Sequence, residues 1–266
     1  MNIDMSRPMD GVVERREPQH PQRRENVATG AAGQRICLWS APVVGSIWVI
    51  CFLMFPGFST PMSPTLSAEA VAAFYADPSN LARARYGMIL FNWFGIGFLP
   101  FYGLITVQMK RMAHNSEVLA YGFLATATSA ATLMSIVILF FQVAAFRTDR
   151  DPSIVQLIND MAWIGFTVPV SFMMAQAGIL ALAILLDRQA KPIYPRWVAH
   201  FNLLTVALIA PAVFASIKLS GPLAWDGIWS FWIRIATYVA WTIVMFFVVL
   251  NAMSRSEEPA FDGRAA

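Results

Sequence analysis

Charged side chains are scarce in this chain: Asp, Glu, Lys and Arg together make up 13% of its 266 residues. A soluble domain carries about 25% charged residues, so the deficit argues against a soluble globular protein. Hydrophobic residues make up 57% of the chain, and the mean hydropathy is +0.55. The composition therefore predicts a protein that lies in a lipid bilayer.

Cysteine and histidine are also rare, which excludes several kinds of site. Cys37 and Cys51 fall in one apolar run. In a helix that rises about 1.5 Å per residue they lie roughly 21 Å apart, so they cannot form a disulfide with each other. The three histidines, His20, His114 and His200, show no HxxxH or HExxH spacing. This argues against a metal centre and a di-iron oxygenase, and we expect no cofactor.

The sequence contains no serine nucleophile elbow and no glycine-rich phosphate loop. The net charge is only +3, and the basic residues are scattered rather than gathered in a stripe. We therefore expect no nucleic-acid partner.

Six apolar runs are each long enough to cross a bilayer as a helix. Their expected ranges are 36–55, 86–107, 118–141, 152–186, 197–217 and 223–251. The fourth run would measure about 52 Å as a helix, well beyond a hydrocarbon core of about 30 Å, so it must tilt, project or kink at Pro169. The fold class is thus all-α: a polytopic membrane protein with a bundle of six transmembrane helices in one domain, residues 36–252.

Polar segments flank and interrupt these runs. Residues 1–35 combine many Arg, Pro, Gln and Gly residues without apolar periodicity, which predicts a disordered cytoplasmic tail; residues 253–266 are a second cytoplasmic tail. The longest connection should contain a short helix, 68–76, capped by Ser67 and stopped at Asp77–Pro78. That helix either lies on the membrane surface or covers a pocket.

The distribution of Lys and Arg predicts the orientation. If the N-terminus is inside, 13 of the 19 basic residues lie on the inner side and 6 on the outer side. Cytoplasmic segments are enriched in Lys and Arg, so both termini should be cytoplasmic.

The last apolar run carries a charge that needs an explanation. Arg234 lies well inside it, and a charge in hydrocarbon costs about 2.5 to 3.5 kcal/mol on insertion scales. Asp226, Ser230 and Arg234 are spaced four apart, so they should share a stripe that faces protein. Arg234 could pair with Asp226, Asp160 or a carbonyl to orient helices, snorkel towards water, or line a polar pocket on the outer side. The candidate ligand-binding residues for such a pocket are Asn92, Asp160, Asp226 and Arg234.

Tryptophans near the same end of the bundle suggest a membrane interface. Trp225, Trp229 and Trp232 form a stripe beside the polar one, and Trp163 stands near the start of the fourth run. Tryptophan is enriched at the level of lipid headgroups, so we expect all four indoles in an interfacial belt.

Four short motifs carry a resemblance: SPTLSAEAVAAFYAD, LARARYGM, NDMAW at 159–163 and YPRW at 194–197. Together they resemble an uncharacterised family of bacterial multi-helix inner-membrane proteins, over about residues 36–252. The resemblance implies a bacterial membrane location, and it assigns no activity and no site residues.

The leading functional hypothesis is a non-catalytic membrane protein that binds a small hydrophobic or lipid-like ligand. A secondary transporter is one alternative, which requires broken helices and an ionisable group near the middle of the membrane. A membrane enzyme acting on a lipophilic substrate is the other, with Asp160 and Asp226 as its one plausible acid pair. A membrane partner and a homo-oligomer both stay open.

Overall fold

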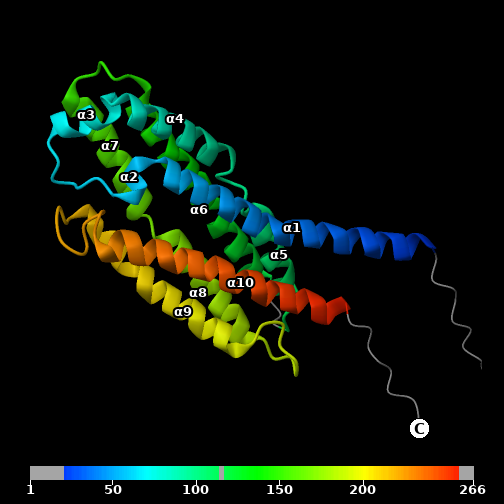
Figure 1. Ribbon diagram of the computed structural model, residues 1–266. Coiled ribbons are helices and arrows are strands. Elements are labelled where there is room, and N and C mark those ends of the chain that lie inside the picture. Colours follow the sequence, from blue (N-terminus) through cyan, green and yellow to red (C-terminus); the bar gives the residue numbers. More distant parts are fainter. Residues whose placement is uncertain (1–20, 114–116, 258–266) are drawn as a thin grey trace, which may run out of the picture. The chain divides into compact units, whose positions relative to one another are not determined.

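The computed structural model describes residues 21–113 and 117–257, and every regular element among them is helical (Figure 1). Contacts separate the helix up to Arg35 from the compact unit that begins at Ile36. The elements are α1 (Pro21–Met54), α2 (Pro56–Ser59), α3 (Ala68–Ala76), α4 (Pro78–Trp93), α5 (Leu99–Lys110), α6 (Val118–Phe146), α7 (Pro152–Thr167), α8 (Ser171–Leu186), α9 (Arg196–Ile209), the 3₁₀ helix η1 (Ala210–Ser216), the π-helix η2 (Ile228–Ile233) and α10 (Arg234–Glu257).

Five helical stretches in the described chain are long and apolar enough to cross a membrane. They are Gly30–Met54, Val118–Phe146, Pro152–Leu186, Arg196–Ser216 and Ile228–Arg255. These stretches support the expected all-helical, multi-pass membrane protein. The expected span 86–107 is not a continuous helix, because α4 ends at Trp93 and α5 begins at Leu99.

The interruption between α4 and α5 has a local cause and a tertiary support. Gly95 and Gly97 are poor helix formers, and Pro100 cannot donate a backbone hydrogen bond. Inside a bilayer, non-helical backbone is tolerated only where protein or a cavity satisfies its polar groups. Here the Trp48 indole of α1 donates a hydrogen bond of 3.1 Å to the Phe94 carbonyl. The break is therefore held by a side chain from another helix.

Three further helices change character along their length. α7 and α8 are separated at residues 168–170, and the expected kink at Pro169 is confirmed. α9 tightens into η1 at Ala210, next to Pro211, and α10 is preceded by the π-helical turn η2. Proline removes a helical donor, and π-helical turns are frequent at functional sites. Four helical segments of the bundle are thus irregular.

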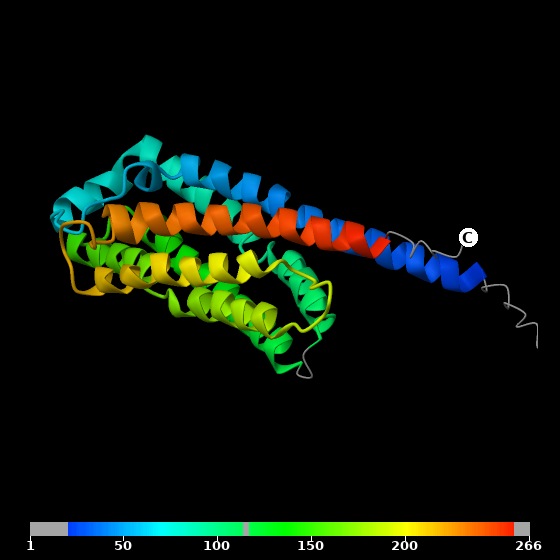
Figure 2. The same ribbon diagram turned by 90° about the horizontal axis from the view of Figure 1, so that it is seen from below.

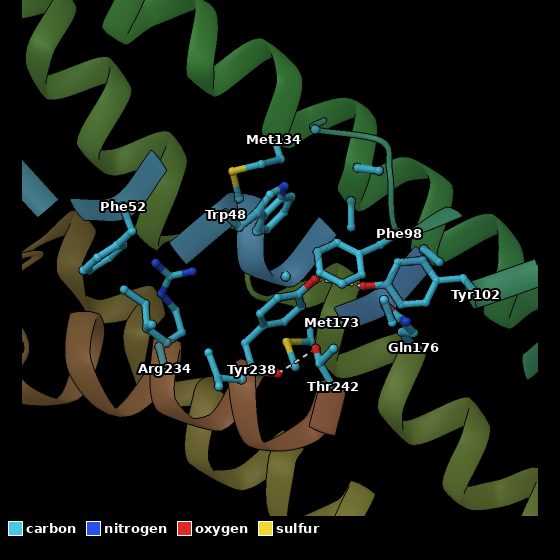
Figure 3. Close-up of a pocket in the computed structure, with 18 of the residues that line it drawn as sticks. Trp48, Phe52, Phe98, Tyr102, Met134, Met173, Gln176, Arg234, Tyr238 and Thr242 are labelled. Carbon is cyan, nitrogen blue, oxygen red and sulfur yellow. Dashed lines mark hydrogen bonds between the residues drawn. The ribbon is translucent and has the colours of Figure 1, made fainter. Parts of the chain in front are cut away.

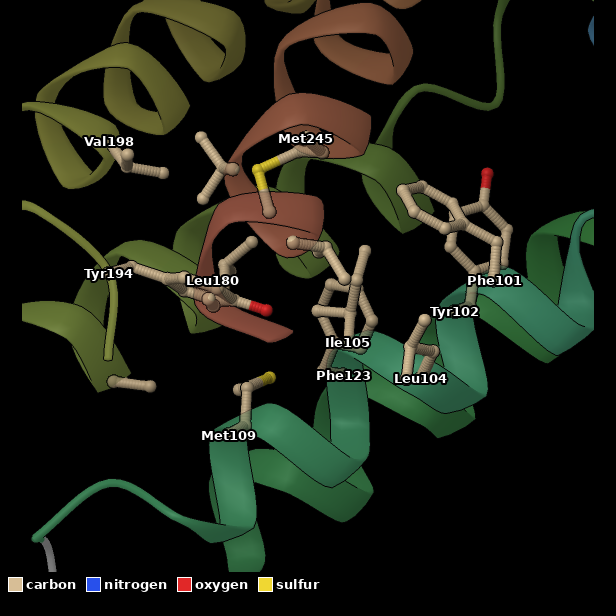
Figure 4. Close-up of a cluster of buried hydrophobic side chains, with 14 of the residues drawn as sticks. Phe101, Tyr102, Leu104, Ile105, Met109, Phe123, Leu180, Tyr194, Val198 and Met245 are labelled. Carbon is tan, nitrogen blue, oxygen red and sulfur yellow. The ribbon is translucent and has the colours of Figure 1, made fainter. Parts of the chain in front are cut away.

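α6 lies at the centre of the bundle and packs against α4, α5, α7 and α8. α9 is in contact with both α8 and α10, and Figure 2 shows it lying between them. Two clusters of buried apolar side chains hold these helices together. The first joins α5, α6, α8, α9 and α10 around Phe101, Phe123 and Met245 (Figure 4). The second surrounds Phe58 and Trp163.

The tails differ from the expectation where they are described. Residues 1–20 and 258–266 lie outside the described residues, but residues 21–35 are helical and belong to α1. Arg, Gln, Glu and Ala in this segment are good helix formers, and an adjoining apolar helix removes the cost of nucleation. The C-terminal helix likewise continues to Glu257 rather than ending at 252. The expected disorder is therefore wrong for 21–35.

The long connection after α1 folds as predicted and is fixed to the bundle. α3 spans Ala68–Ala76, Ser67 accepts a hydrogen bond from the Ala70 amide, and Asp77 caps α4 in turn. The buried Tyr75 hydroxyl donates to Asn159 Oδ1 on α7 at 3.0 Å. α3 therefore packs firmly against α7.

Two of the tryptophans expected in an interfacial belt are part of the core instead. Trp163 is fully buried among Phe58, Phe141 and Trp225. Trp225 is buried as well, and its indole donates to the Met62 carbonyl at 2.6 Å. α2 and the chain that follows it cover both side chains, and this coverage is a tertiary feature that spacing along the sequence does not reveal.

Candidate functional site

A cavity of about 670 Å³ lies among the helices of the compact unit (Figure 3). Its wall comes from α1, from the ends of α4 and α5, and from α6, α7, α8 and α10. Most of the wall is apolar and much of it is aromatic: Trp48, Phe52, Phe91, Phe98, Phe166, Phe172 and Phe246. Cavities of about 300 to 1,000 Å³ with apolar walls and a few polar groups are typical of small-molecule sites.

The irregular parts of the bundle meet at this cavity. Gly95 and Phe98 come from the break between α4 and α5, and Pro169 comes from the break between α7 and α8. Ile209 is the last residue of α9 before the 3₁₀ helix, and Arg234 directly follows the π-helical turn. The interruptions thus open space between helices at one place.

Small residues on α6 create further space. Ala127, Ala130 and Ala131 all line the cavity. A four-residue spacing of small side chains lets helices approach closely. Gly95 lies close to the small residues of α6, since a Cβ added to it would be only 3.1 Å from Ser135 Oγ. At Ala131 the same row faces the cavity.

Arg234 is the one charged side chain on the described cavity wall. Its Nε donates to the Ser230 carbonyl at 3.0 Å, and its guanidinium carbon lies 4.6 Å from the centre of the Phe166 ring. Its Nη2 is buried and has no hydrogen-bond partner in the described chain. Figure 3 shows the guanidinium pointing into the cavity, towards Phe52. Arg234 is therefore held in place with part of its donor capacity unused.

The other three predicted site residues lie away from this wall. Asp160 lies on α7 next to Asn159, the residue that accepts the hydrogen bond from Tyr75 of α3. Asn92 is half-buried on α4, just before the break. The structure therefore does not bring Asn92, Asp160, Asp226 and Arg234 together in one pocket.

Asp226 lies in the loop before η2 rather than inside the last apolar helix, which begins at Ile228. Burial raises the pKa of its carboxyl, while hydrogen bonds from the backbone and from Ser63 oppose that rise. No ion pair joins it to Arg234 in the described chain. The expected Asp226–Arg234 and Asp160–Arg234 pairings are thus not formed.

A polar strip on the wall escaped the sequence analysis. The hydroxyls of Tyr102 on α5 and Tyr238 on α10 are 3.0 Å apart. The buried Gln176 of α8 and Thr242 of α10 also line the cavity, and the Thr242 hydroxyl donates to the Tyr238 main-chain carbonyl at 3.0 Å. These residues carry no charge and belong to no motif, so helical spacing was the one available signal. They provide uncharged donors and acceptors beside the apolar wall.

The described wall carries no carboxylate and no histidine, and its titratable side chains are Arg234, Tyr102 and Tyr238. His200 is exposed on α9 and is not part of the wall. Comparison with known protein families, with curated proteins and with solved structures finds no match.

Proposed function

We propose that this protein is a six-span membrane protein that binds a small hydrophobic or lipid-like molecule in the cavity between its helices. In addition to the five long helical stretches, α4 and α5 together make one crossing, the second in chain order. The Trp48 indole supports the backbone between these two helices. The cavity replaces the outward-facing polar vestibule expected from the sequence, since Arg234 is the one predicted site residue on its wall. The binding role needs no cofactor.

The size and lining of the cavity carry this proposal. The space opens to the outside of the bundle, because Leu53, Ile243 and Phe247 on its wall are more than half exposed. An apolar molecule can therefore enter it from the surrounding lipid. The aromatic wall favours an apolar occupant, and the polar strip at Tyr102 and Tyr238 favours one with a polar group.

Mass spectrometry under native conditions tests this binding directly. Protein purified in a mild detergent should carry one additional mass of a small apolar molecule, which is released on denaturation. Extraction with organic solvent should then identify the molecule. A spectrum of unliganded protein alone, with no such molecule in the extract, would count against the proposal.

We propose that the protein lies in the inner membrane of the cell, with both termini in the cytoplasm. The orientation rests on the 13 to 6 distribution of basic residues. In a background without Cys37 and Cys51, Thr148→Cys should react with a membrane-impermeant thiol reagent in intact cells, because the loop after α6 is outside. Lys191→Cys, in the loop after α8, should react only after permeabilisation. The reverse pattern would invert the topology.

A secondary transporter is the second candidate, and the interrupted helices favour it. Breaks at Gly95 and Pro169 and the π-helical turn before Arg234 all reach the cavity, as discontinuous helices do at the binding sites of transporters. Reconstitution distinguishes the two functions. A transporter moves the bound molecule across a proteoliposome membrane, whereas a binding protein retains it without transfer.

A further inference from the structure

The electrostatics of the cavity define the chemistry of its occupant more narrowly than its shape does. The described wall carries one full charge, Arg234, and no carboxylate. A cation in a low-dielectric site is costly unless an anion neutralises it. Asp160 and Asp226, the acids expected to pair with it, do not line the wall, and no ion pair joins either of them to Arg234 in the described chain. The described chain therefore supplies no counterion for this guanidinium.

The position of Arg234 is suited to recognition. Ser230 holds its Nε, and Ser230 is itself buried with its hydroxyl bonded to the Leu223 carbonyl. Phe166 covers one face of the guanidinium at 4.6 Å. The unpartnered Nη2 remains free to donate. A fixed guanidinium with free N–H groups suits carboxylate and phosphate oxygens, which it binds with short, charge-assisted hydrogen bonds.

We infer that the cavity binds an amphipathic anion, whose carboxylate or phosphate oxygens contact Arg234 and whose apolar body lies along the aromatic wall. This inference rests on the proposed ligand binding and adds the charge of the ligand. Figure 3 shows Phe52, Trp48 and Met134 around the space that the guanidinium faces, with Tyr238 beside it. A long-chain carboxylic acid and an anionic phospholipid share this chemistry.

Two brominated probes of equal length test the charge. Dibrominated stearic acid and dibrominated stearyl alcohol both quench tryptophan fluorescence on contact, and Trp48 lies on the cavity wall. At alkaline pH, the full-length protein in mild detergent should bind the acid about tenfold or more tightly than the alcohol, since a hydrogen bond to a charged group is worth that factor. Arg234→Gln should abolish this preference while alcohol binding persists, and Arg234→Lys should keep part of it.

Arg150→Gln is the matched control, because Arg150 donates to the Val143 carbonyl and neither of these residues lines the cavity. Its preference for the acid should equal that of the unaltered protein. If the unaltered protein binds acid and alcohol equally, or if Arg234→Gln keeps the preference, the anion inference is wrong and hydrophobic binding still stands. If neither probe quenches, the proposed binding function itself fails.

If Arg234→Gln does not fold, the preference of the unaltered protein and of Arg234→Lys for the acid over the alcohol decides the question.

A competition experiment distinguishes the two sources of the anion. Protein in nanodiscs is titrated with the brominated acid in the presence of phosphatidylglycerol or of phosphatidylcholine. Displacement by phosphatidylglycerol alone assigns a phospholipid headgroup, and displacement by neither lipid assigns a free acid.

Discussion

Replacing Ala131 by Phe should remove ligand binding and at the same time raise the stability of the protein. Ala131 lies on α6 and lines the cavity, so the added ring projects into the space that the ligand needs. Filling a cavity with apolar atoms commonly stabilises a protein by about 0.5 to 2 kcal/mol. Binding of the brominated alcohol should therefore disappear, while the melting temperature of the purified protein rises.

The opposite signs make this substitution informative. A packing defect would lower both binding and stability, whereas a filled site lowers binding alone. Ala125→Phe is the matched control, since Ala125 is exposed on the same helix and does not line the cavity. It should leave binding unchanged. Undiminished binding in the Ala131 variant would place the ligand elsewhere in the protein.

Local signals in the sequence predicted much of the helical framework. Hydropathy marked the fourth run as 152–186, and the structure has helix from Pro152 to Leu186 with the kink at Pro169. Ser67 predicted the start of the short helix in the long connection, and that helix is confirmed at Ala68–Ala76. Caps, prolines and apolar length act within a few residues, which is why a single sequence reveals them.

Features that depend on contacts between distant segments could not be predicted in this way. Trp163 and Trp225 were expected at a membrane interface, but the chain around Phe58 and Met62 buries them. The second apolar run was expected to be one helix, because its hydropathy is continuous across Gly95 and Gly97. Gly95, Gly97 and Pro100 weaken this helix locally, and the Trp48 indole that supports the interrupted backbone comes from another helix.

Of the four site residues predicted from the sequence, one lies on the cavity wall. Arg234 stood out because a charge in an apolar run is conspicuous, and it lies on the cavity wall. Asp160 and Asp226 stood out for the same reason, yet neither of them lies on the cavity wall. Tyr102, Gln176 and Tyr238 carry no charge, so nothing distinguished them from ordinary residues of an apolar helix. Where polar side chains converge is a property of helix packing rather than of composition.

Replacing Gly227 by Ala should destabilise the protein by about 2 to 4 kcal/mol, the range expected when an added atom strains a packed backbone. A Cβ at this position would lie 2.5 Å from the carbonyl oxygens of both Gly221 and Pro222. These oxygens belong to the main chain and cannot rotate away as a flexible side chain would. The loop that precedes η2 must therefore shift.

That loop determines where the π-helical turn begins. The Gly227 amide donates to the Ala224 carbonyl at 2.8 Å, and the Trp229 amide donates to the Pro222 carbonyl at 2.9 Å. Ser230, which holds Arg234, is bonded to Leu223 of the same loop. A displaced loop therefore also loosens the guanidinium, so the preference for the brominated acid over the alcohol should fall along with the melting temperature.

Gly178→Ala provides the comparison for this substitution. Gly178 lies in α8, and a Cβ there would meet no atom within 4 Å. Alanine also has the better helix propensity, by up to about 1 kcal/mol of unfolding free energy. The melting temperature of this variant should therefore stay unchanged or rise. Thermal unfolding of both variants in the same detergent measures the difference. Equal melting temperatures for the two variants would mean that the loop yields at little cost, and the position of Arg234 would then have to depend on its contacts with Ser230 and Phe166 alone.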